Sequence, residues 1–179
     1  QPLIGLVGHG SKSALSLKEL LMAENNVRAK VLTVSDGVVA GTREDTSGTE
    51  LVRVMTEHGF DVVDKSVVAD GAESVRTALL ELTKNFAGLV VTTGGTGFAP
   101  RDQTPEGTLA VIEREAPGIA EAMRAVNPLG RLSRGVVGVC GRSIIVNTPG
   151  SPKGCVEQLV AVLDVLPHAL ALVAETPTE

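Results

Sequence analysis

A glycine-rich loop, Thr93–Gly97, is the clearest sign of chemistry in this sequence of 179 residues. It follows Gly88–Thr92, an apolar run typical of a strand that is buried on both faces. Because glycine has no Cβ, the backbone N–H groups of such a loop can converge on an anion. Open α/β folds bind ligands at the carboxyl ends of their strands, so the loop predicts a phosphate site there. The residues expected to bind are Thr93, Gly94, Gly95, Thr96 and Gly97.

Charged residues after the glycine loop extend this predicted site. Arg101 supplies a cation and Asp102 a carboxylate, while Thr104 and Glu106 begin a helix whose N-terminus favours phosphate. Asp102 could hold a Mg²⁺ ion that bridges polyphosphate oxygens, because Mg²⁺ is held by one or two carboxylates plus substrate phosphates. The alternative for Asp102 is a salt bridge to Arg101 or to Arg43.

A second carboxylate, Asp70, follows the predicted strand Asp61–Ala69 and is expected at the same edge of the sheet. Asp70 and Glu73 have the spacing of a capping box, and this spacing alone would explain an aspartate there. A carboxylate can cap a helix and still face a metal ion. Both interpretations of Asp70 therefore stand.

The layout of strand, loop and helix start recurs in Asn147–Gly154. Lys153 lies at a helix start, where its positive charge interacts unfavourably with the positive end of the helix dipole. A role in binding an anionic ligand would explain a lysine at this position. The residues of this segment that we expect at the binding site are Asn147, Pro149, Gly150, Ser151 and Lys153.

The end of the first predicted strand, Ala29–Ser35, leads into a polar loop that could cover the same edge. Ser35 and Asp36 are candidate contacts there, with simple solvation of a loop as the alternative for Asp36. Ser47 and Glu50 have capping-box spacing, so we expect the Ser47 hydroxyl to cap a helix first and to contact a ligand second.

The elements that must position these residues alternate between β-branched runs and helical periodicity from Arg28 onward, which is typical of βαβ units. The predicted fold is a three-layer α/β domain, a largely parallel sheet with helices on both faces and a short antiparallel hairpin near the C-terminal end. Further predicted strands are Val136–Cys140 and Ser143–Asn147, and the predicted helices start at Ser47, Asp70, Thr104, Pro117 and Lys153 and end near Gly59, Asn85, Glu115, Val126 and Ala174. A kink before Pro167 is the alternative to a straight last helix.

Composition excludes several classes of function. The chain has no Trp or Tyr, only three Phe and a formal net charge of −5, which disfavours nucleic acid as a partner. No apolar run reaches the ~18 residues of a membrane span. We interpret Cys140 and Cys155 as reduced core thiols, which suits a cytoplasmic protein.

We assign residues 28–176 to one domain and residues 1–27 to an N-terminal extension, linker or added segment.

Covalent catalysis is not expected, because no Ser-His-Asp or Cys-His set can be assembled by spacing from the three histidines. The string Gly5–Ser13 is similar to a Walker A loop, but a serine separates its last glycine from Lys12. Positioning of substrates and neutralisation of charge are left as the mechanism.

Six segments together, in this order, resemble the molybdopterin-binding family, whose relatives include the MogA and MoaB proteins of molybdenum cofactor synthesis and a domain of gephyrin. The resemblance runs from Ala29 to Ala174, although Asn127–Arg131 is shorter than the family's usual segment. The six segments are Thr33–Gly37, Asp45–Gly48, Thr92–Gly97, Arg101–Glu106, Leu132–Gly135 and Asn147–Ser151.

This resemblance implies an enzyme that transfers AMP from Mg-ATP to the terminal phosphate of molybdopterin and releases pyrophosphate. It implies that Asp70 and Asp102 are the catalytic carboxylates that hold Mg²⁺, and that the glycine loop and Ser151 bind phosphates, with Ser133 a further candidate contact. A homotrimer or hexamer, and a downstream molybdate-inserting protein as partner, are also implied. The alternative is a non-catalytic paralogue that binds, carries or scaffolds molybdopterin; a related fold also occurs in the competence-damage-inducible group, which hydrolyses pyrophosphate bonds.

Overall fold

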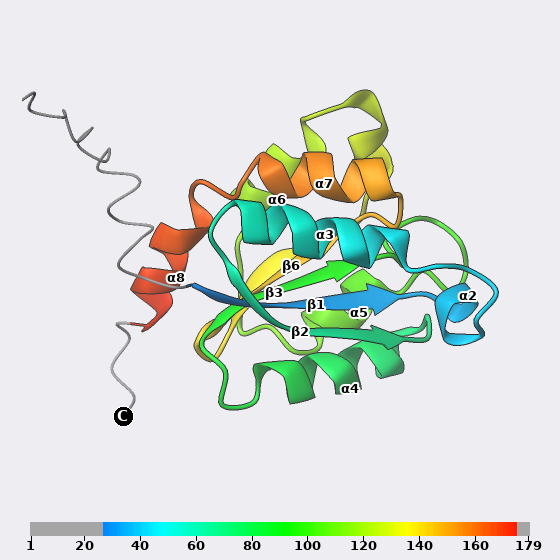
Figure 1. Cartoon of the computed structure of the whole chain (residues 1–179), viewed down its shortest axis with the longest axis horizontal. Coiled ribbons are helices and arrows are strands. Elements are labelled where there is room, and N and C mark those ends of the chain that lie inside the picture. The colour runs from blue at the N-terminus through cyan, green and yellow to red at the C-terminus, as the bar shows by residue number, and fades with distance from the viewer. Residues whose placement is uncertain (1–26, 175–179) are drawn as a thin grey trace, which may run out of the picture.

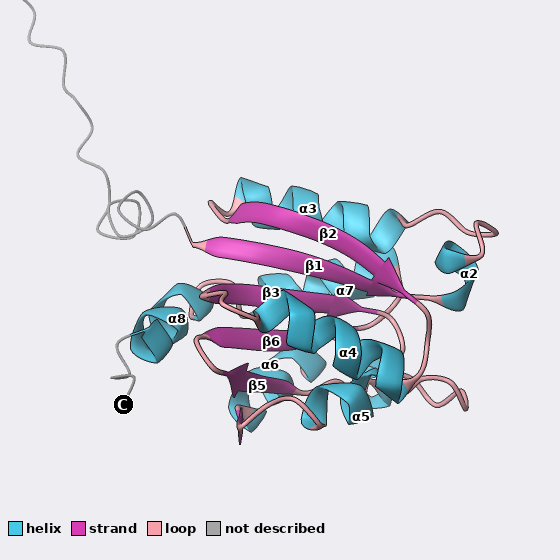
Figure 2. Ribbon diagram, turned by 90° about the horizontal axis from the view of Figure 1, so that it is seen from below, coloured by secondary structure: helices cyan, strands magenta, loops and turns pink. Residues whose placement is uncertain are grey.

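The computed structural model describes residues 27–174, which form a six-stranded sheet in the order β2-β1-β3-β6-β5-β4. The first four strands of that order are parallel, whereas β5 and β4 run antiparallel to their neighbours. Figure 2 shows the strands side by side. The strands are β1 (Arg28–Val34), β2 (Asp61–Val68), β3 (Gly88–Thr93), β4 (Arg114–Glu115), β5 (Val137–Cys140) and β6 (Ser143–Thr148).

Helices cover both faces of the sheet, which confirms the predicted three layers. In Figure 1, α3, α6 and α7 lie above the sheet and α4 lies below it, and α5 packs against α4. Each face has its own core, one built around Leu51 and Leu159 and the other around Val75 and Leu79. The helices are α2 (Asp36–Val39), α3 (Thr46–Glu57), α4 (Ala72–Thr83), α5 (Thr104–Leu109), α6 (Pro117–Arg124), the 3₁₀ helix η1 (Pro128–Leu132), α7 (Pro152–Val160) and α8 (Leu166–Ala174).

The burial of each strand follows from its place in the sheet. Every residue of the central strands β3 and β6 is buried, as expected for parallel strands with helices on both sides. The edge strand β2 alternates between exposed and half-buried positions. The predicted hairpin is also confirmed, because Gly141 at the turn between β5 and β6 has a φ of +55°.

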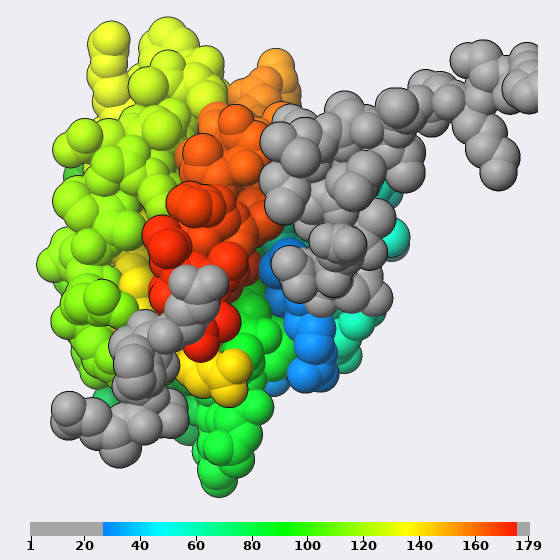
Figure 3. Space-filling model, turned by 90° about the vertical axis from the view of Figure 1, so that its left-hand side faces the viewer, coloured from blue at the N-terminus to red at the C-terminus, as the bar shows by residue number. Residues whose placement is uncertain are grey.

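All four parallel strands end at one edge of the sheet, at the right of Figure 1, where α2 follows β1. The opposite end is occupied by α8, drawn in red in Figure 3, which contacts β3 and β6. Loops that follow β1, β2, β3 and β6 are therefore gathered at the carboxyl edge.

The predicted cap at Ser47 is wrong, and the capping interpretation of Asp70 is excluded. Helix α3 is capped by Asp45, whose Oδ1 accepts a hydrogen bond from Gly48 N at 3.0 Å, and not by Ser47. Thr33 on β1 donates to the same oxygen at 2.8 Å, so a contact between distant segments selects the cap. Helix α4 has Gly71 at its N-cap position and no side-chain cap, which leaves Asp70 available for another role.

Two predicted helices are shorter than expected. The helix predicted from Thr104 to Glu115 ends at Leu109, because Glu113 N instead donates to Val139 O at 2.8 Å and leads into β4. The single helix predicted from Lys153 to Ala174 is two helices, α7 and α8, and Pro167 lies in the first turn of α8, where its missing N–H costs nothing.

Both cysteines are free, as predicted, with Cys155 buried and Cys140 partly buried. None of the helices in the described range has the length and apolar character needed to cross a membrane. The predicted extension, residues 1–27, lies outside the described residues except for Val27, and so do the last two residues of the predicted domain.

Candidate functional site

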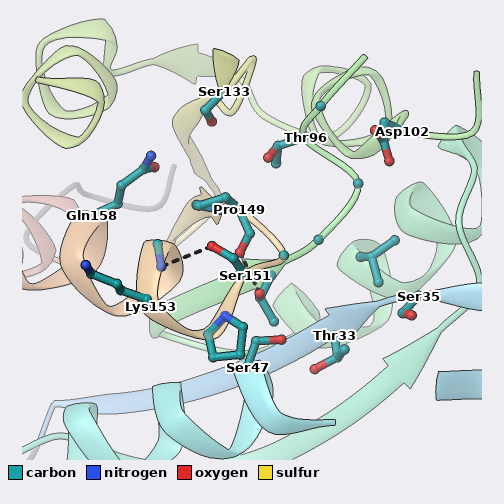
Figure 4. Close-up of a pocket in the computed structure, with 18 of the residues that line it drawn as sticks. Thr33, Ser35, Ser47, Thr96, Asp102, Ser133, Pro149, Ser151, Lys153 and Gln158 are labelled. Carbon is teal, nitrogen blue, oxygen red and sulfur yellow. Dashed lines mark hydrogen bonds between the residues drawn. The ribbon is translucent and has the colours of Figure 1, made fainter. Parts of the chain in front are cut away.

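A cavity of about 960 Å³ opens at the carboxyl edge of the sheet. Its walls are the loops after β1, β3 and β6, together with η1 and the start of α7 (Figure 4). Fourteen of the predicted site residues line it: Ser35, Ser47, Asp70, Thr93, Gly94, Gly95, Thr96, Gly97, Asp102, Ser133, Pro149, Gly150, Ser151 and Lys153.

The glycine loop has a backbone conformation that requires glycine. Gly94 and Gly95 have φ values of +100° and +66°. A Cβ on Gly94 would lie 2.2 Å from Val34 O, and a Cβ on Gly95 would lie 2.3 Å from Thr104 Oγ1. Thr104 fixes the loop, because its Oγ1 donates to Gly94 O at 2.8 Å and its N–H donates to Gly95 O at 2.9 Å.

This conformation leaves three successive N–H groups free for a ligand. Within residues 27–174, the N–H groups of Gly95, Thr96 and Gly97 donate to no protein acceptor. Successive N–H groups that point into a cavity form a concave binding place for an anion. The loop therefore has the donors that a phosphate group needs.

The two predicted carboxylates stand beside this loop. Asp70 Oδ1 is 3.4 Å from the position a Cβ on Gly95 would take, and Asp102 Oδ2 is 2.8 Å from the same position on Gly97. Asp70 Oδ2 accepts a hydrogen bond from Asp36 N at 2.8 Å, and Asp102 Oδ2 accepts one from Ala99 N at 3.0 Å. The other oxygen of each carboxylate accepts no hydrogen bond from any described residue.

This donor set fits a cation that arrives with a polyphosphate. Mg²⁺ bound with substrate phosphates needs only one or two protein carboxylates. No group of three or more His, Cys, Asp and Glu side chains in the described part of the chain could hold a metal ion alone. Asp70 and Asp102 thus suit the metal of a nucleotide complex rather than a metal bound by protein ligands only.

Arg101 pairs with Asp36 and not with Asp102, which excludes the proposed Arg101–Asp102 salt bridge. Arg101 Nε is 2.5 Å from Asp36 Oδ2, and its Nη2 donates to Asp36 Oδ1 at 3.0 Å and to Asp70 O at 2.7 Å. The hydrogen bond from Arg101 lowers the pKa of Asp36 below its usual value. Asp36 is therefore a paired carboxylate, and the expectation of a merely solvated loop residue is wrong.

The second predicted loop abuts the first. Thr93 Oγ1 donates to Pro149 O at 2.8 Å, and a Cβ on Gly150 would lie 3.3 Å from the Cα of Gly94. Ser151 caps α7, because its Oγ accepts a hydrogen bond from Gly154 N at 3.1 Å. Lys153 is exposed at the cavity mouth, with its Nζ 3.7 Å from Glu157 Oε1.

Four predicted site residues do not line the cavity: Asp36, Thr104, Glu106 and Asn147. Glu106 pairs with Arg134, which also donates through Nε to Gly97 O at 2.8 Å and through Nη2 to Asp102 O. The hydrogen bond from Arg134 lowers the pKa of Glu106. Glu106 thus holds the arginine that braces the far end of the glycine loop.

Asn147 braces the loops from within the core. It is buried, and its Nδ2 donates to Thr92 Oγ1 and to Thr108 Oγ1, each at 3.0 Å. Its Oδ1 accepts a hydrogen bond from Val136 N at 3.2 Å. The amide therefore joins β3, β6, α5 and the segment before β5.

Sequence reasoning missed one wall of the cavity, formed by η1 and α7. Asn127 Nδ2 donates to Glu157 Oε2 at 2.8 Å and so fastens η1 to α7. No local pattern marks these residues, because only the folded chain brings them to the cavity. The lining residues that were not predicted are Thr33, Val34, Val38, Arg43, Glu44, Thr46, Asn127, Pro128, Leu129, Gly130, Leu132, Pro152, Gly154, Glu157 and Gln158.

Comparison with known proteins gives consistent matches. Residues 30–168 match a family model described as "Probable molybdopterin binding domain". A molybdopterin adenylyltransferase of Helicobacter pylori is 37% identical over 150 residues, which cover 80% of this chain and 85% of that protein. Gephyrin of Dictyostelium discoideum is 34% identical over 177 residues, 91% of this chain but 25% of gephyrin. The crystal structure of the molybdopterin biosynthesis enzyme MoaB from Thermus thermophilus has 45% identity and a TM-score of 0.79, covering 86% of this chain and 99% of that one.

Proposed function

Since this chain belongs to the family of molybdopterin-binding domains, we propose that it is a molybdopterin adenylyltransferase of molybdenum cofactor biosynthesis. In the proposed reaction, an oxygen of the terminal phosphate of molybdopterin attacks the α-phosphorus of ATP. The bond from that phosphorus to the oxygen bridging to the β-phosphate breaks, and pyrophosphate leaves. The products are adenylylated molybdopterin and pyrophosphate.

The observation that carries this proposal is the glycine loop between two carboxylates. The free N–H groups of Gly95, Thr96 and Gly97 can donate hydrogen bonds to phosphate oxygens and so stabilise the negative charge that develops there. Asp70 and Asp102 each offer an oxygen to Mg²⁺ that enters with ATP, and the ion would neutralise charge on the leaving pyrophosphate. The protein would act by alignment and electrostatics, with no covalent intermediate.

The proposed reaction does not require a general base. The second pKa of a phosphate monoester is about 6, so the attacking oxygen of the molybdopterin phosphate is already largely ionised at neutral pH. The reaction therefore needs no histidine, and neither described histidine lines the cavity.

The direct test is to mix purified protein with molybdopterin, ATP and Mg²⁺ and to measure pyrophosphate release and adenylylated product. We expect turnover that requires both molybdopterin and Mg²⁺. Asp102→Asn should lower kcat by at least about 100-fold, whereas Asp164→Asn, an exposed carboxylate away from the cavity, should leave it unchanged. Tight molybdopterin binding without turnover would instead indicate a carrier or scaffold.

Three further properties are proposed from family membership alone. They are an assembly of three or six copies, a cytoplasmic location, and transfer of the product to a molybdate-inserting protein. Gel filtration with light scattering tests the first of them directly.

A further inference from the structure

The proposed phosphate chemistry leaves part of the cavity lining unused. We call it the amide lobe, formed by Asn127–Gly130 together with Glu157 and Gln158. Asn127 Nδ2 donates to Glu157 Oε2 on α7 at 2.8 Å, and Asn127 Oδ1 accepts a hydrogen bond from Gly130 N at 3.1 Å. These two bonds fix the outer wall of the lobe against α7. The lobe is therefore a built part of the cavity.

Gln158 is the unusual residue of this lobe, because its side chain is buried yet unpartnered. It is 3% exposed, and no described residue forms a hydrogen bond with its amide. Asp45 Oδ2 is the only described side-chain polar atom that is fully sealed without a hydrogen bond, and Lys65 Nζ lies 2.7 Å from it. The Gln158 amide therefore keeps contact with the cavity. In Figure 4 it projects from α7 away from Lys153.

A buried amide without a partner is unfavourable unless a ligand supplies the missing hydrogen bonds. A glutamine amide presents one acceptor and two donors side by side. This pattern matches the edge of a heteroaromatic ring that carries an adjacent donor and acceptor, as in the pairing of glutamine with adenine.

The rest of the lobe suits the face of such a ring. Pro128 and Leu129 line it, and Leu129 is 74% exposed, so its side chain is free to cover a flat ligand. The same cavity continues to the glycine loop, where phosphate groups are expected. One molecule with a ring at one end and a phosphate at the other could therefore contact both the amide lobe and the glycine loop.

We infer that Gln158 binds the hydrogen-bonding edge of a fused heteroaromatic ring in the amide lobe, and so determines specificity for one of the two substrates. This inference rests on the proposed function, in which both substrates carry such a ring. Adenine offers an amino donor beside a ring-nitrogen acceptor. The pterin offers two adjacent donors, a ring N–H and an amino group, next to a carbonyl acceptor. Glutamine can pair with either edge.

Two variants distinguish adenine from the pterin as the ring that Gln158 binds. Gln158→Met keeps the length of the side chain but removes its hydrogen bonds, and Gln158→Glu replaces the amide with two acceptors. The dissociation constants of AMP, of unsubstituted pterin and of inorganic pyrophosphate would be measured by calorimetry on the full chain. We expect Gln158→Met to weaken one ring-bearing probe by about tenfold or more and to leave pyrophosphate binding unchanged.

Gln158→Glu then identifies the ring. A carboxylate can accept from both adjacent donors of a pterin, so pterin binding should persist in this variant if the pterin occupies the lobe. It cannot donate to adenine, so AMP binding should weaken by about tenfold if adenine occupies the lobe.

The inference is overturned if both variants bind all three probes as the wild type does, if pyrophosphate binding falls together with ring binding, or if the wild type binds neither ring. Should Gln158→Met not fold, as thermal unfolding would reveal, Gln158→Glu decides the question with the same probes. Failure of the proposed function is a different result: the wild type would bind AMP and pterin but release no pyrophosphate.

Discussion

Asp36 and Asp70 exchange two hydrogen bonds across the carboxyl edge of the sheet. The N–H of Asp36 donates to Asp70 Oδ2 at 2.8 Å, and the N–H of Asp70 donates to Asp36 Oδ1 at 3.1 Å. Arg101 joins this pair by binding the Asp36 carboxylate and the carbonyl of Asp70. The orientation of Asp70 therefore depends on two residues that do not line the cavity.

Asp36→Ala keeps the N–H that donates to Asp70 Oδ2 but removes the carboxylate that accepts from Asp70 N and binds Arg101. The backbone that carries Asp70 would then shift, and kcat for adenylyl transfer should fall by about 10- to 100-fold, the scale expected for a displacement of about 1 Å. The KM for ATP should change much less. Steady-state kinetics at saturating Mg²⁺ measures both constants. Glu73→Ala, an exposed residue at the nearby start of α4, is the control and should behave as the wild type does. Equal kcat in the two variants would contradict a positioning role for Asp36.

Gly95→Ala should destabilise the protein by about 1–3 kcal/mol or more and abolish phosphate binding, because the φ of +66° is unfavourable for alanine and its Cβ would collide with Thr104. Urea unfolding and pyrophosphate calorimetry provide the two measurements. Gly118→Ala is the matched control, since a Cβ there meets no atom within 4 Å. That variant should be neutral, or more stable by up to about 1 kcal/mol.

Asn147→Ala should lower the free energy of unfolding by about 2–4 kcal/mol, because it removes three hydrogen bonds, those with Val136 N and with the buried hydroxyls of Thr92 and Thr108. Urea denaturation followed by circular dichroism measures the change. The exposed helix residue Glu81 serves as a control, and its replacement by alanine should stay within about 0.5 kcal/mol of wild type. A loss below about 1 kcal/mol for Asn147→Ala would show that water replaces the lost hydrogen bonds.

The ion pair of Glu106 with Arg134 should make the free energy of unfolding depend on pH in the acidic range. Arg134 lowers the pKa of Glu106 in the folded state below its ordinary value of 4.5, so the unfolded chain takes up this proton at higher pH than the folded one. The stabilisation is fully present above about pH 4.5 and is lost as the pH falls through the folded pKa. The wild type should be more stable than Glu106→Gln at pH 7, and the difference should shrink toward pH 3. Urea midpoints at both pH values test this, and a difference independent of pH would contradict the ion pair.

The placement of Asp102 and of the glycine loop at the cavity could be predicted from the sequence because their signals are local. A buried strand followed by three glycines in four positions places a backbone anion site at the carboxyl edge, and this placement does not depend on contacts with distant residues. The strands were predicted for the same reason, since β3 and β6 are continuous apolar runs.

Predictions that depend on competition between distant groups failed. Ser47 and Asp45 both have side chains that can cap α3, and Thr33 on a separate strand favours Asp45. Gln158 was missed because a glutamine in a helix is ordinary in sequence, and only the placement of η1 over α7 turns it toward a cavity. Such information is carried by tertiary packing and not by periodicity.

The close approach of Gly94 and Gly150 bears on how this cavity can diversify during evolution. A Cβ on Gly94 would collide with Val34 O, and a Cβ on Gly150 would press on the Cα of Gly94, so the wall made by Gly94 and Gly150 has little freedom to accept new residues. The opposite wall is built from side chains of η1 and α7, where Leu129 is mostly exposed and tolerates exchange. Descendants of this chain can therefore acquire preferences for new ligands at one wall while inheriting the chemistry of the other unchanged.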